Sequence, residues 1–177
     1  VYVCGYYGTA VTEIYEDGVN QALADFSDKV TLASQLTDDD WTIEGAYNVM
    51  SSYINGGYDF NIVFAQDDVV AKGAYQALKE AGLDIGVIST GGSEDSHIAM
   101  ENGEMIANMT APADLQGLIA FGMAWAELNG ETWGGDKIAL PVIPIDMANF
   151  DEWLFWDDLD GGYQWVVANI GPYVPAI

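Results

Sequence analysis

Apolar positions along the chain follow two periods, which predict strands alternating with helices. Short apolar or extended runs indicate strands at Val1–Gly5, Val30–Ser34, Ile62–Ala65, Ile85–Thr90, Glu104–Thr110 and Ile138–Ile145. Between these runs, apolar residues recur at intervals of three and four, which predicts helices over about Thr9–Phe26, Thr42–Ile54, Val70–Ala81, Ser93–Asn102 and Pro112–Asn129. Strands and helices alternating at this spacing form a parallel sheet with right-handed crossovers. We therefore expect an α/β fold, a three-layer sandwich with a mainly parallel sheet of five or six strands. Pro141 and Pro144 favour an edge position for the last strand.

Three polar residues, Gln66, Asp67 and Asp68, stand between the apolar run at Ile62–Ala65 and the helix that follows it. In an open α/β sheet, ligands bind beyond the carboxyl ends of the strands. We therefore expect this trio to lie where a ligand would bind. Asp68 also suits the capping position at the start of the helix, and both roles remain open at this point.

The chain ends with an aromatic-rich segment over residues 146–177, where the alternation of strands and helices stops. Its aromatic residues include Trp153, Phe155, Trp156, Tyr163, Trp165 and Tyr173. Such side chains need a surface to cover them, so we expect this tail to pack on the preceding lobe or on a partner. The lobe itself is predicted over residues 1–145.

The charge balance is strongly acidic, with 4 Lys and Arg against 28 Asp and Glu and a formal net charge of -24. Because basic surfaces bind phosphate backbones, nucleic acid is excluded as a partner, and anionic membranes are disfavoured for the same reason. No apolar run approaches the ~20 residues that cross a bilayer. The chain opens on a core-like strand at Val1–Gly5, so we expect the leader of an exported form to lie outside this sequence.

Few residues suit metal or catalytic chemistry. Cys4 and His97 are each the only residue of their kind, which excludes an internal disulfide and argues against zinc. We expect Cys4 in the core and His97 at an exposed helix position. The aspartate runs at 38–40 and 157–160 lack the ligand spacing of a calcium loop. No Gly-x-Ser-x-Gly motif or phosphate-binding loop is present. We therefore expect no metal, no cofactor and no enzymatic activity.

Several segments resemble the sugar-binding proteins of bacterial ATP-binding-cassette importers, the ribose-binding type of periplasmic binding protein. They include Val30–Gln35, Asn48–Met50, Val63–Asp68, Ala77–Gly82, Gly103–Ala107 and Leu140–Ile145. The resemblance covers roughly residues 1–150, and the effector-binding halves of lactose-repressor-like regulators share the same fold. It implies a protein outside the cytoplasm, in the periplasm or at the cell surface, that closes on a sugar and presents it to a membrane permease.

The chain departs from this family in its extent. It corresponds to the second lobe and the final crossings, while most of the first lobe has no counterpart in the sequence. In the family, the helix at 112–130 would pack on that first lobe. Two readings follow: a solute-binding lobe that is completed by a separate first lobe, or a structural assembly protein that self-associates through this helix and the Trp-rich tail.

The family's sugar-contacting positions carry over only in part. The resemblance places the family's sugar-stacking aromatic residue at Trp41, where a flat ring suits the C–H face of a neutral sugar. A Trp that only packs against the start of the next helix would give the same sequence pattern. The family's Asn falls at Asp67, its Arg at Tyr15, its Asp at Gly91, and its Gln near Ala111. Lining loops are expected at 6–9, 35–41, 66–68 and 90–93. The predicted ligand-binding residues are Trp41, Asp67, Gln66, Asp68, Tyr7, Tyr15 and Gly91.

Overall fold

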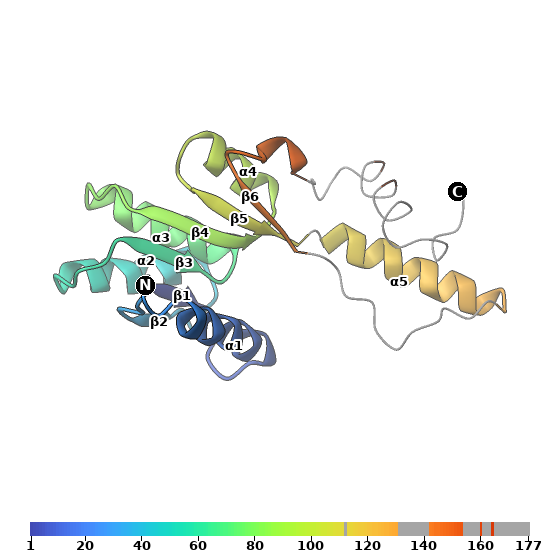
Figure 1. Ribbon diagram of the computed structural model, residues 1–177, viewed down its shortest axis with the longest axis horizontal. Coiled ribbons are helices and arrows are strands. Elements are labelled where there is room, and N and C mark those ends of the chain that lie inside the picture. The colour runs from blue at the N-terminus through green and yellow to red at the C-terminus, as the bar shows by residue number, and fades with distance from the viewer. Residues whose placement is uncertain (112, 131–141, 154–159, 161–163, 165–177) are drawn as a thin grey trace.

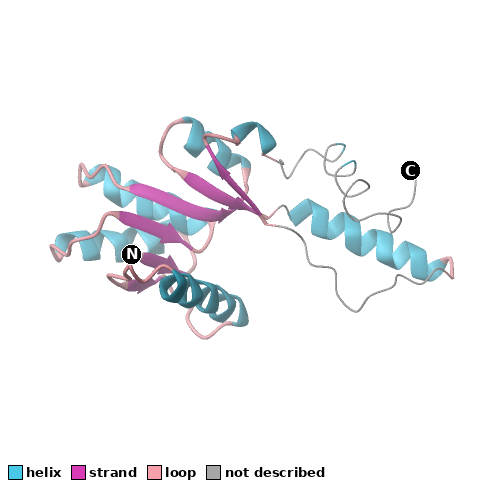
Figure 2. Cartoon of the chain, in the orientation of Figure 1, coloured by secondary structure: helices cyan, strands magenta, loops and turns pink. Residues whose placement is uncertain are grey.

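The computed structural model describes all residues except 112, 131–141, 154–159, 161–163 and 165–177 (Figures 1 and 2). Its strands are β1 (Tyr2–Cys4), β2 (Gln35–Thr37), β3 (Ile62–Ala65), β4 (Gly86–Gly91), β5 (Ala107–Thr110) and β6 (Ile143–Asp146). Its helices are α1 (Ala10–Asp25), α2 (Ile43–Asn55), α3 (Asp68–Glu80), α4 (Glu94–Glu101), α5 (Ala113–Leu128) and the short 3-10 helix η1 (Phe150–Glu152). Strands and helices alternate as the apolar periods predict.

The six strands form one sheet in the order β2-β1-β3-β4-β5-β6. The first five strands are parallel, and β6 runs antiparallel to β5. The predicted mainly parallel α/β sheet is therefore confirmed. Pro144 lies in β6 opposite Met109, at the edge of the sheet, as its missing N–H requires. Residues 138–141 of the predicted last strand lie outside the described residues.

The strand predicted at Val30–Ser34 is wrong. The structure places β2 at Gln35–Thr37, and residues 30–34 form no strand. The register explains the shift, because Tyr2 is the first residue of β1 and it pairs with Gln35. Residues 30–34 lie beyond the amino end of this ladder, so their β-forming side chains find no adjacent strand. Val30 and Leu32 are exposed as a result.

One face of the sheet carries the main core, covered by α2, α3 and α4. Val63, Ala65 and Val87 alternate along β3 and β4 on this face and are fully buried against α2 and α3, with Met50 and Leu78 in the same cluster. Alternating side chains of a strand point to opposite faces, so only one set enters this core.

Helix α1 lies on the opposite face of the sheet, in front of it in Figure 1. Polar contacts hold it there: Tyr15 bonds Thr90 and Glu16 bonds Gln35, and both partners belong to the strand face that carries Phe64. Thr12 is the one buried residue of this helix. The apolar stripe predicted for it is largely exposed, including Ile14 with 70% of its surface accessible.

Helix α5 extends away from the sheet, beyond β5 and β6 (Figure 1). Leu115, Ile119 and Ala126 are buried along it, while Trp125 and Leu128 remain exposed. Most of the predicted aromatic tail lies outside the described residues. Trp153, within the described part, is buried, and its ring meets His97 edge-on with centroids 5.2 Å apart. The domain boundary at residue 145 stays a prediction.

Candidate functional site

The candidate site is a cluster of loops at the carboxyl ends of β1 to β4. It comprises residues 5–9 after β1, 38–42 after β2, 66–67 after β3 and 92–93 after β4. Hydrogen bonds and ring contacts, described below, link these loops to one another. Because the strands are parallel, their carboxyl ends share one edge of the sheet, and this brings together segments that lie far apart in the sequence.

Trp41 stands at the centre of this cluster. Its indole lies against the backbone of Gly5, so closely that a Cβ at that glycine would overlap the ring. Its Nε1–H donates a hydrogen bond to Asp67 Oδ2. The side chain is half-buried, and its backbone adopts a φ of 52°, the only positive φ at a non-glycine residue among the described residues. The indole is therefore fixed by contacts with two other loops.

Asp38 holds the loop that presents Trp41. Its carboxylate accepts hydrogen bonds from the backbone N–H groups of Asp40 (3.0 Å) and Thr42 (2.7 Å). Its own N–H donates to the carbonyl of Cys4. The residue is 2% exposed, so the first aspartate of the acidic run is a buried turn-former and not a solvated charge. These bonds stabilise the left-handed conformation at Trp41, which costs a non-glycine residue free energy.

Asp67 caps the third helix. Its Oδ1 accepts a hydrogen bond from the backbone N–H of Val70 at 2.8 Å, and its backbone is extended, as at an N-cap. The alternative that Asp68 caps this helix is therefore wrong. With Oδ2 bonded to Trp41, each oxygen of Asp67 receives a donor from the protein.

Gln66 is 1% exposed, and its side chain supports the loop cluster through contacts with β1 and α1. Its Oε1 accepts from the backbone N–H of Gly5 at 3.0 Å, and its side chain lies 3.4 Å from the hydroxyls of Tyr2 and Thr12. These contacts join β1, α1 and β3. Gln66 thus has a structural role in this conformation, and its contact with a ligand stays a prediction.

Asp68 anchors a second polar network, on the face of the sheet that α2, α3 and α4 cover. Its Oδ1 accepts from Ser89 Oγ at 2.8 Å and from Asn108 Nδ2 at 2.7 Å. Its Oδ2 accepts from the backbone N–H of Ser93 at 2.9 Å. Ser89 and Asn108 are fully buried, so this carboxylate satisfies polar groups that would otherwise be left unpaired in the core.

Tyr15, Tyr7 and Gly91 complete the predicted set. The hydroxyl of Tyr15 lies 2.7 Å from Thr90 Oγ1. Thr90 gives its own hydrogen to the carbonyl of Gln66 at 2.6 Å, so Tyr15 is the donor. Tyr7 is 63% exposed in the first loop.

Gly91 has a φ of +136°, and a Cβ built on it would lie 2.6 Å from Asp68 Oδ2. No side chain fits there without displacing Asp68.

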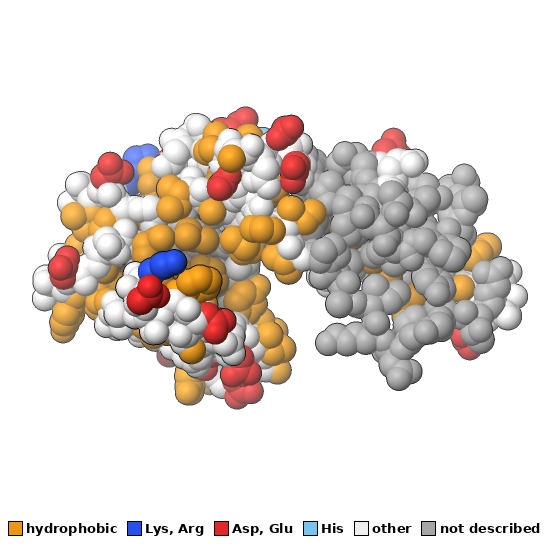
Figure 3. Space-filling model, viewed as in Figure 1, with side chains coloured by type: hydrophobic (Ala, Val, Ile, Leu, Met, Phe, Trp, Pro, Cys, Tyr) orange, Lys and Arg blue, Asp and Glu red, His pale blue; other side chains and the backbone are white. Residues whose placement is uncertain are grey.

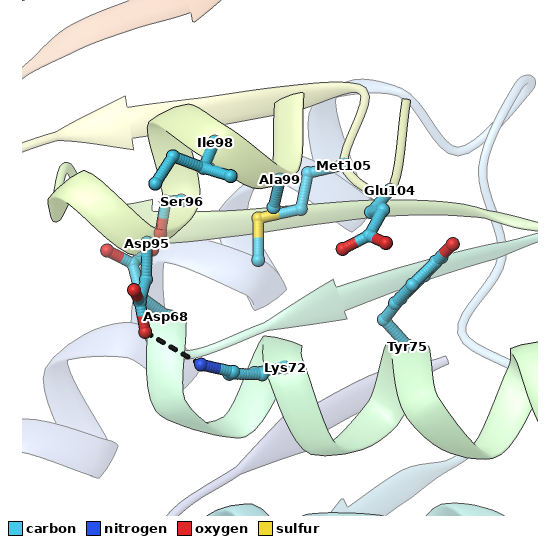
Figure 4. Close-up of a pocket in the computed structure, with 9 residues that line it drawn as sticks. All are labelled: Asp68, Lys72, Tyr75, Asp95, Ser96, Ile98, Ala99, Glu104 and Met105. Carbon is cyan, nitrogen blue, oxygen red and sulfur yellow. Dashed lines mark hydrogen bonds and ion pairs between the residues drawn. The ribbon is translucent and has the colours of Figure 1, made fainter. Parts of the chain in front are cut away.

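A separate small cavity lies between α3 and α4 (Figure 4), and Trp41 is not among the residues that line it. Its volume is about 130 Å³, and the exposed ion pair of Lys72 and Asp95, 2.7 Å apart, crosses its mouth. Pockets for drug-sized ligands are larger, about 300–1,000 Å³. This cavity is therefore small for such a ligand, and we place the candidate site at the Trp41 cluster because that cluster lies at the carboxyl edge of the sheet.

His97 does not occupy the exposed position predicted for it. It is half-buried, and its ring stacks on Phe150 with centroids 4.3 Å apart.

Among the described residues, no group of three or more His, Cys, Asp or Glu side chains could hold a metal ion. No described helix is long and apolar enough to cross a membrane. Acidic side chains are scattered over the visible surface in Figure 3, with few lysines among them.

Sequence reasoning did not single out several residues that build the site, namely Gly5, Asp38, Ser89, Thr90 and Asn108, although Asp38 and Thr90 lie in loops that were predicted to line it. Gly5 carries a detectable signal, since a glycine directly after a strand permits a close approach. Asp38 carries one too, because an aspartate is a frequent turn-former through its side chain. The other three give no local signal, because their partners lie more than 15 residues away along the chain.

Known proteins of similar sequence and fold bind small solutes. A family model described as a periplasmic binding protein domain matches residues 1–132. The chain is 34% identical over 128 residues to the ribose import binding protein RbsB of Salmonella typhimurium, covering 72% of this chain and 42% of that protein. It is 30% identical over 132 residues to a xylitol-binding protein of Mycolicibacterium smegmatis, covering 73% and 37%.

Solved structures agree on the fold. An ABC transporter solute-binding protein of Bacillus halodurans with bound myo-inositol superposes with a TM-score of 0.78 at 22% identity, over 86% of this chain and 53% of that one. A periplasmic solute-binding protein of Actinobacillus succinogenes with bound D-allose gives a TM-score of 0.77 at 21% identity, over 86% and 55%. The chain thus spans about half the length of these proteins or less.

The fold, a mainly parallel sheet whose loops gather at its carboxyl edge, defines a class, the α/β lobes of the periplasmic-binding-protein type. More narrowly, the chain belongs to the periplasmic binding protein family, and the resemblance to the sugar-binding proteins of ATP-binding-cassette importers is confirmed. These relatives are solute-binding proteins, which agrees with the expectation that the chain is not an enzyme. The alternative of a self-associating assembly protein finds no support among them.

Proposed function

We propose that this chain is the second lobe of an extracytoplasmic solute-binding protein that recognises a neutral sugar-like ligand for the permease of an ATP-binding-cassette importer. The observation that carries the proposal is the fixed, half-buried indole of Trp41 at the carboxyl edge of the sheet. A flat aromatic face held in place suits the C–H surface of a sugar ring. Ligands named for the relatives, ribose, xylitol, myo-inositol and D-allose, are neutral polyols of this kind.

The electrostatics of the cluster favour a neutral ligand over an anionic one. Two of the described lysines lie on α3 and pair with carboxylates there. Lys72 pairs with Asp95, and Lys79 pairs with Glu104. The loops around Trp41 instead carry Asp39, Asp40 and Asp67. Carboxylates accept hydrogen bonds from sugar hydroxyls but repel phosphate or carboxylate groups. Phosphorylated sugars and sugar acids are therefore poor candidates.

The neighbouring side chains supply contacts of complementary chemistry. Tyr7 offers an exposed hydroxyl and an aromatic edge. Tyr15 replaces the positively charged residue that the family resemblance would place there, and its hydroxyl lies at the same edge through Thr90. Asp68 and Gln66 support the cluster from within and contact the ligand only if their networks open. The family's hinge closure would bring the first lobe over this surface.

The proposal is tested by titrating the full chain with ribose, xylitol, myo-inositol and D-allose, using calorimetry and thermal shift. We expect at least one of these polyols to bind, and Trp41→Ala to abolish that binding. Trp125→Ala is the matched control, since Trp125 is a half-exposed tryptophan of α5 and does not belong to the loop cluster around Trp41. Ribose 5-phosphate is expected not to bind. Binding that survives Trp41→Ala, or a preference for the phosphorylated sugar, would contradict the proposed site.

A further inference from the structure

We propose that Asp67 acts as the positioning residue of Trp41, so that the stacking surface depends on a carboxylate at this position. The role differs from the direct ligand contact that the family resemblance implies for residue 67. Its binding consequences rest on the proposed function, whereas the contact itself can be tested without any ligand.

The hydrogen-bonding chemistry of the pair is asymmetric. An indole N–H can only donate, and an ionised carboxylate can only accept. Asp67 uses Oδ1 to cap α3 through Val70 and Oδ2 to receive the Trp41 N–H. An asparagine at this position could still cap the helix with its single oxygen. Its NH₂ group would then face the indole N–H, donor against donor, so the bond to Trp41 would be lost.

The other restraints on Trp41 act on its backbone and on one face of its ring, and the bond to Asp67 adds a restraint at the indole nitrogen. The buried Asp38 holds the backbone of the loop through Asp40 and Thr42. Gly5 lies beneath the ring and sets its distance from the sheet. Neither of these contacts is a hydrogen bond to the ring, whereas the bond at Nε1 restrains the χ1 and χ2 torsions that orient the indole. A ring that is already oriented loses less conformational freedom when a ligand stacks on it.

The same geometry links residue 67 to the start of α3. The carboxylate that orients the indole also caps the helix that follows β3, so Trp41 is tied to the rigid part of the lobe and not only to its own loop. Sites supported by helices and strands are held more accurately than sites supported by loops alone. This link explains how a residue in a left-handed loop can present a stable surface.

The test uses Asp67→Asn and Asp67→Ser in the full chain labelled with ¹⁵N at its tryptophans. Both variants keep a side-chain oxygen that can cap α3, and both lose the acceptor that faces the indole. The indole N–H resonance of Trp41, assigned through Trp41→Phe, should move toward the position of a solvent-bonded indole and exchange faster with water. The melting temperature should fall only moderately, because one hydrogen bond is lost while the helix cap is kept. Affinity for the polyol that binds best should fall severalfold, up to about tenfold, because binding must then also immobilise the indole.

The outcomes separate this proposal from the proposed function. A Trp41 resonance that stays unchanged in both variants overturns the positioning role, whether or not binding falls, since a fall would then mark Asp67 as a direct ligand. If no polyol binds the wild-type chain, the proposed function fails, and the resonance still decides the contact. Asp67→Asn should lower the affinity less in the Trp41→Phe background than in the wild type, because the phenyl ring has no N–H for residue 67 to accept.

Discussion

The side-chain amide of Asn108 donates a hydrogen bond to Asp68 across 2.7 Å, which joins β5 to the first turn of α3. The same oxygen also receives the hydroxyl of Ser89 from β4. One carboxylate therefore connects two strands and a helix under the candidate site, and it does so with donors that have no access to water.

Replacing Asp68 by alanine should destabilise the protein by about 3 kcal/mol, because it leaves buried donors of Ser89 and Asn108 without this acceptor. Urea unfolding of the variant and the wild type measures the difference. Asp95→Ala is the control, since its ion pair with Lys72 is exposed and should contribute less than about 1 kcal/mol. Equal losses for the two variants would contradict the role assigned to the buried network.

Replacing Gly91 by alanine should cost more stability than replacing Gly103. Both glycines have positive φ, +136° and +72°, so each substitution carries a backbone penalty of about 1 kcal/mol. Only at Gly91 would the new Cβ also press on Asp68, 2.6 Å away, while Gly103 faces open space. The melting temperatures of the two variants give the comparison. A Gly103→Ala loss as large as that of Gly91→Ala would show that Asp68 moves aside freely.

Removing the Tyr15 hydroxyl should destabilise the protein by about 1 kcal/mol, the typical net contribution of one hydrogen bond. In Tyr15→Phe, Thr90 keeps its bond to the carbonyl of Gln66 and loses only the donor from α1. Tyr7→Phe, at a 63% exposed site, should stay within about 0.5 kcal/mol of the wild type. Chemical denaturation distinguishes them, and an unchanged Tyr15→Phe would mean that α1 is held by its other contacts.

Stability should fall as the pH rises above about 9. Burial raises the pKa of the Cys4 thiol above its ordinary value of 9.0 and raises the pKa of the Tyr2 phenol well above 10.0, because desolvation disfavours both anions. Below these ordinary values, both groups are protonated whether the chain is folded or unfolded. Above them, the unfolded chain releases protons that the folded chain retains, so alkaline pH favours unfolding.

Urea unfolding at pH 8 and pH 10 measures this effect. Tyr2→Phe removes one of the two ionisations and should show a smaller loss between the two pH values than the wild type. The phenol lies 3.4 Å from Gln66 Oε1, so the variant should also start slightly less stable at pH 8. Identical pH dependence in both proteins would exclude Tyr2 as a contributor.

The helices were the most predictable part of the fold. The helix predicted over Val70–Ala81 is observed at Asp68–Glu80, and the one predicted over about Thr9–Phe26 at Ala10–Asp25. Their period and their capping residues are local, so the sequence nearby carries the information. The strand predicted at Val30–Ser34 failed for the opposite reason. Its side chains favour a strand, but a strand exists only where a neighbour pairs with it, and β1 pairs with Gln35–Thr37.

The candidate site was predictable as a location and less so as chemistry. The polar trio after Ile62–Ala65 does lie at the carboxyl edge beside Trp41, because the segments that follow parallel strands all leave the sheet at that edge. Which of the three meets Trp41 could not be read from the sequence. Asp67 and Asp68 are adjacent and identical in type, yet one orients the indole and the other enters the core network.

By itself, the sequence determined that strands and helices alternate, that the loops after the strands gather at one edge, and that the surface is strongly acidic. These properties follow from local periods, from the handedness of the connections and from composition. Only the tertiary structure decided the register of β2, the partners of Asp67 and Asp68, and the exposure of the α1 stripe. Each of these depends on which distant segments come into contact, such as Trp41 with Asp67 or Tyr15 with Thr90, and no local pattern encodes such pairings.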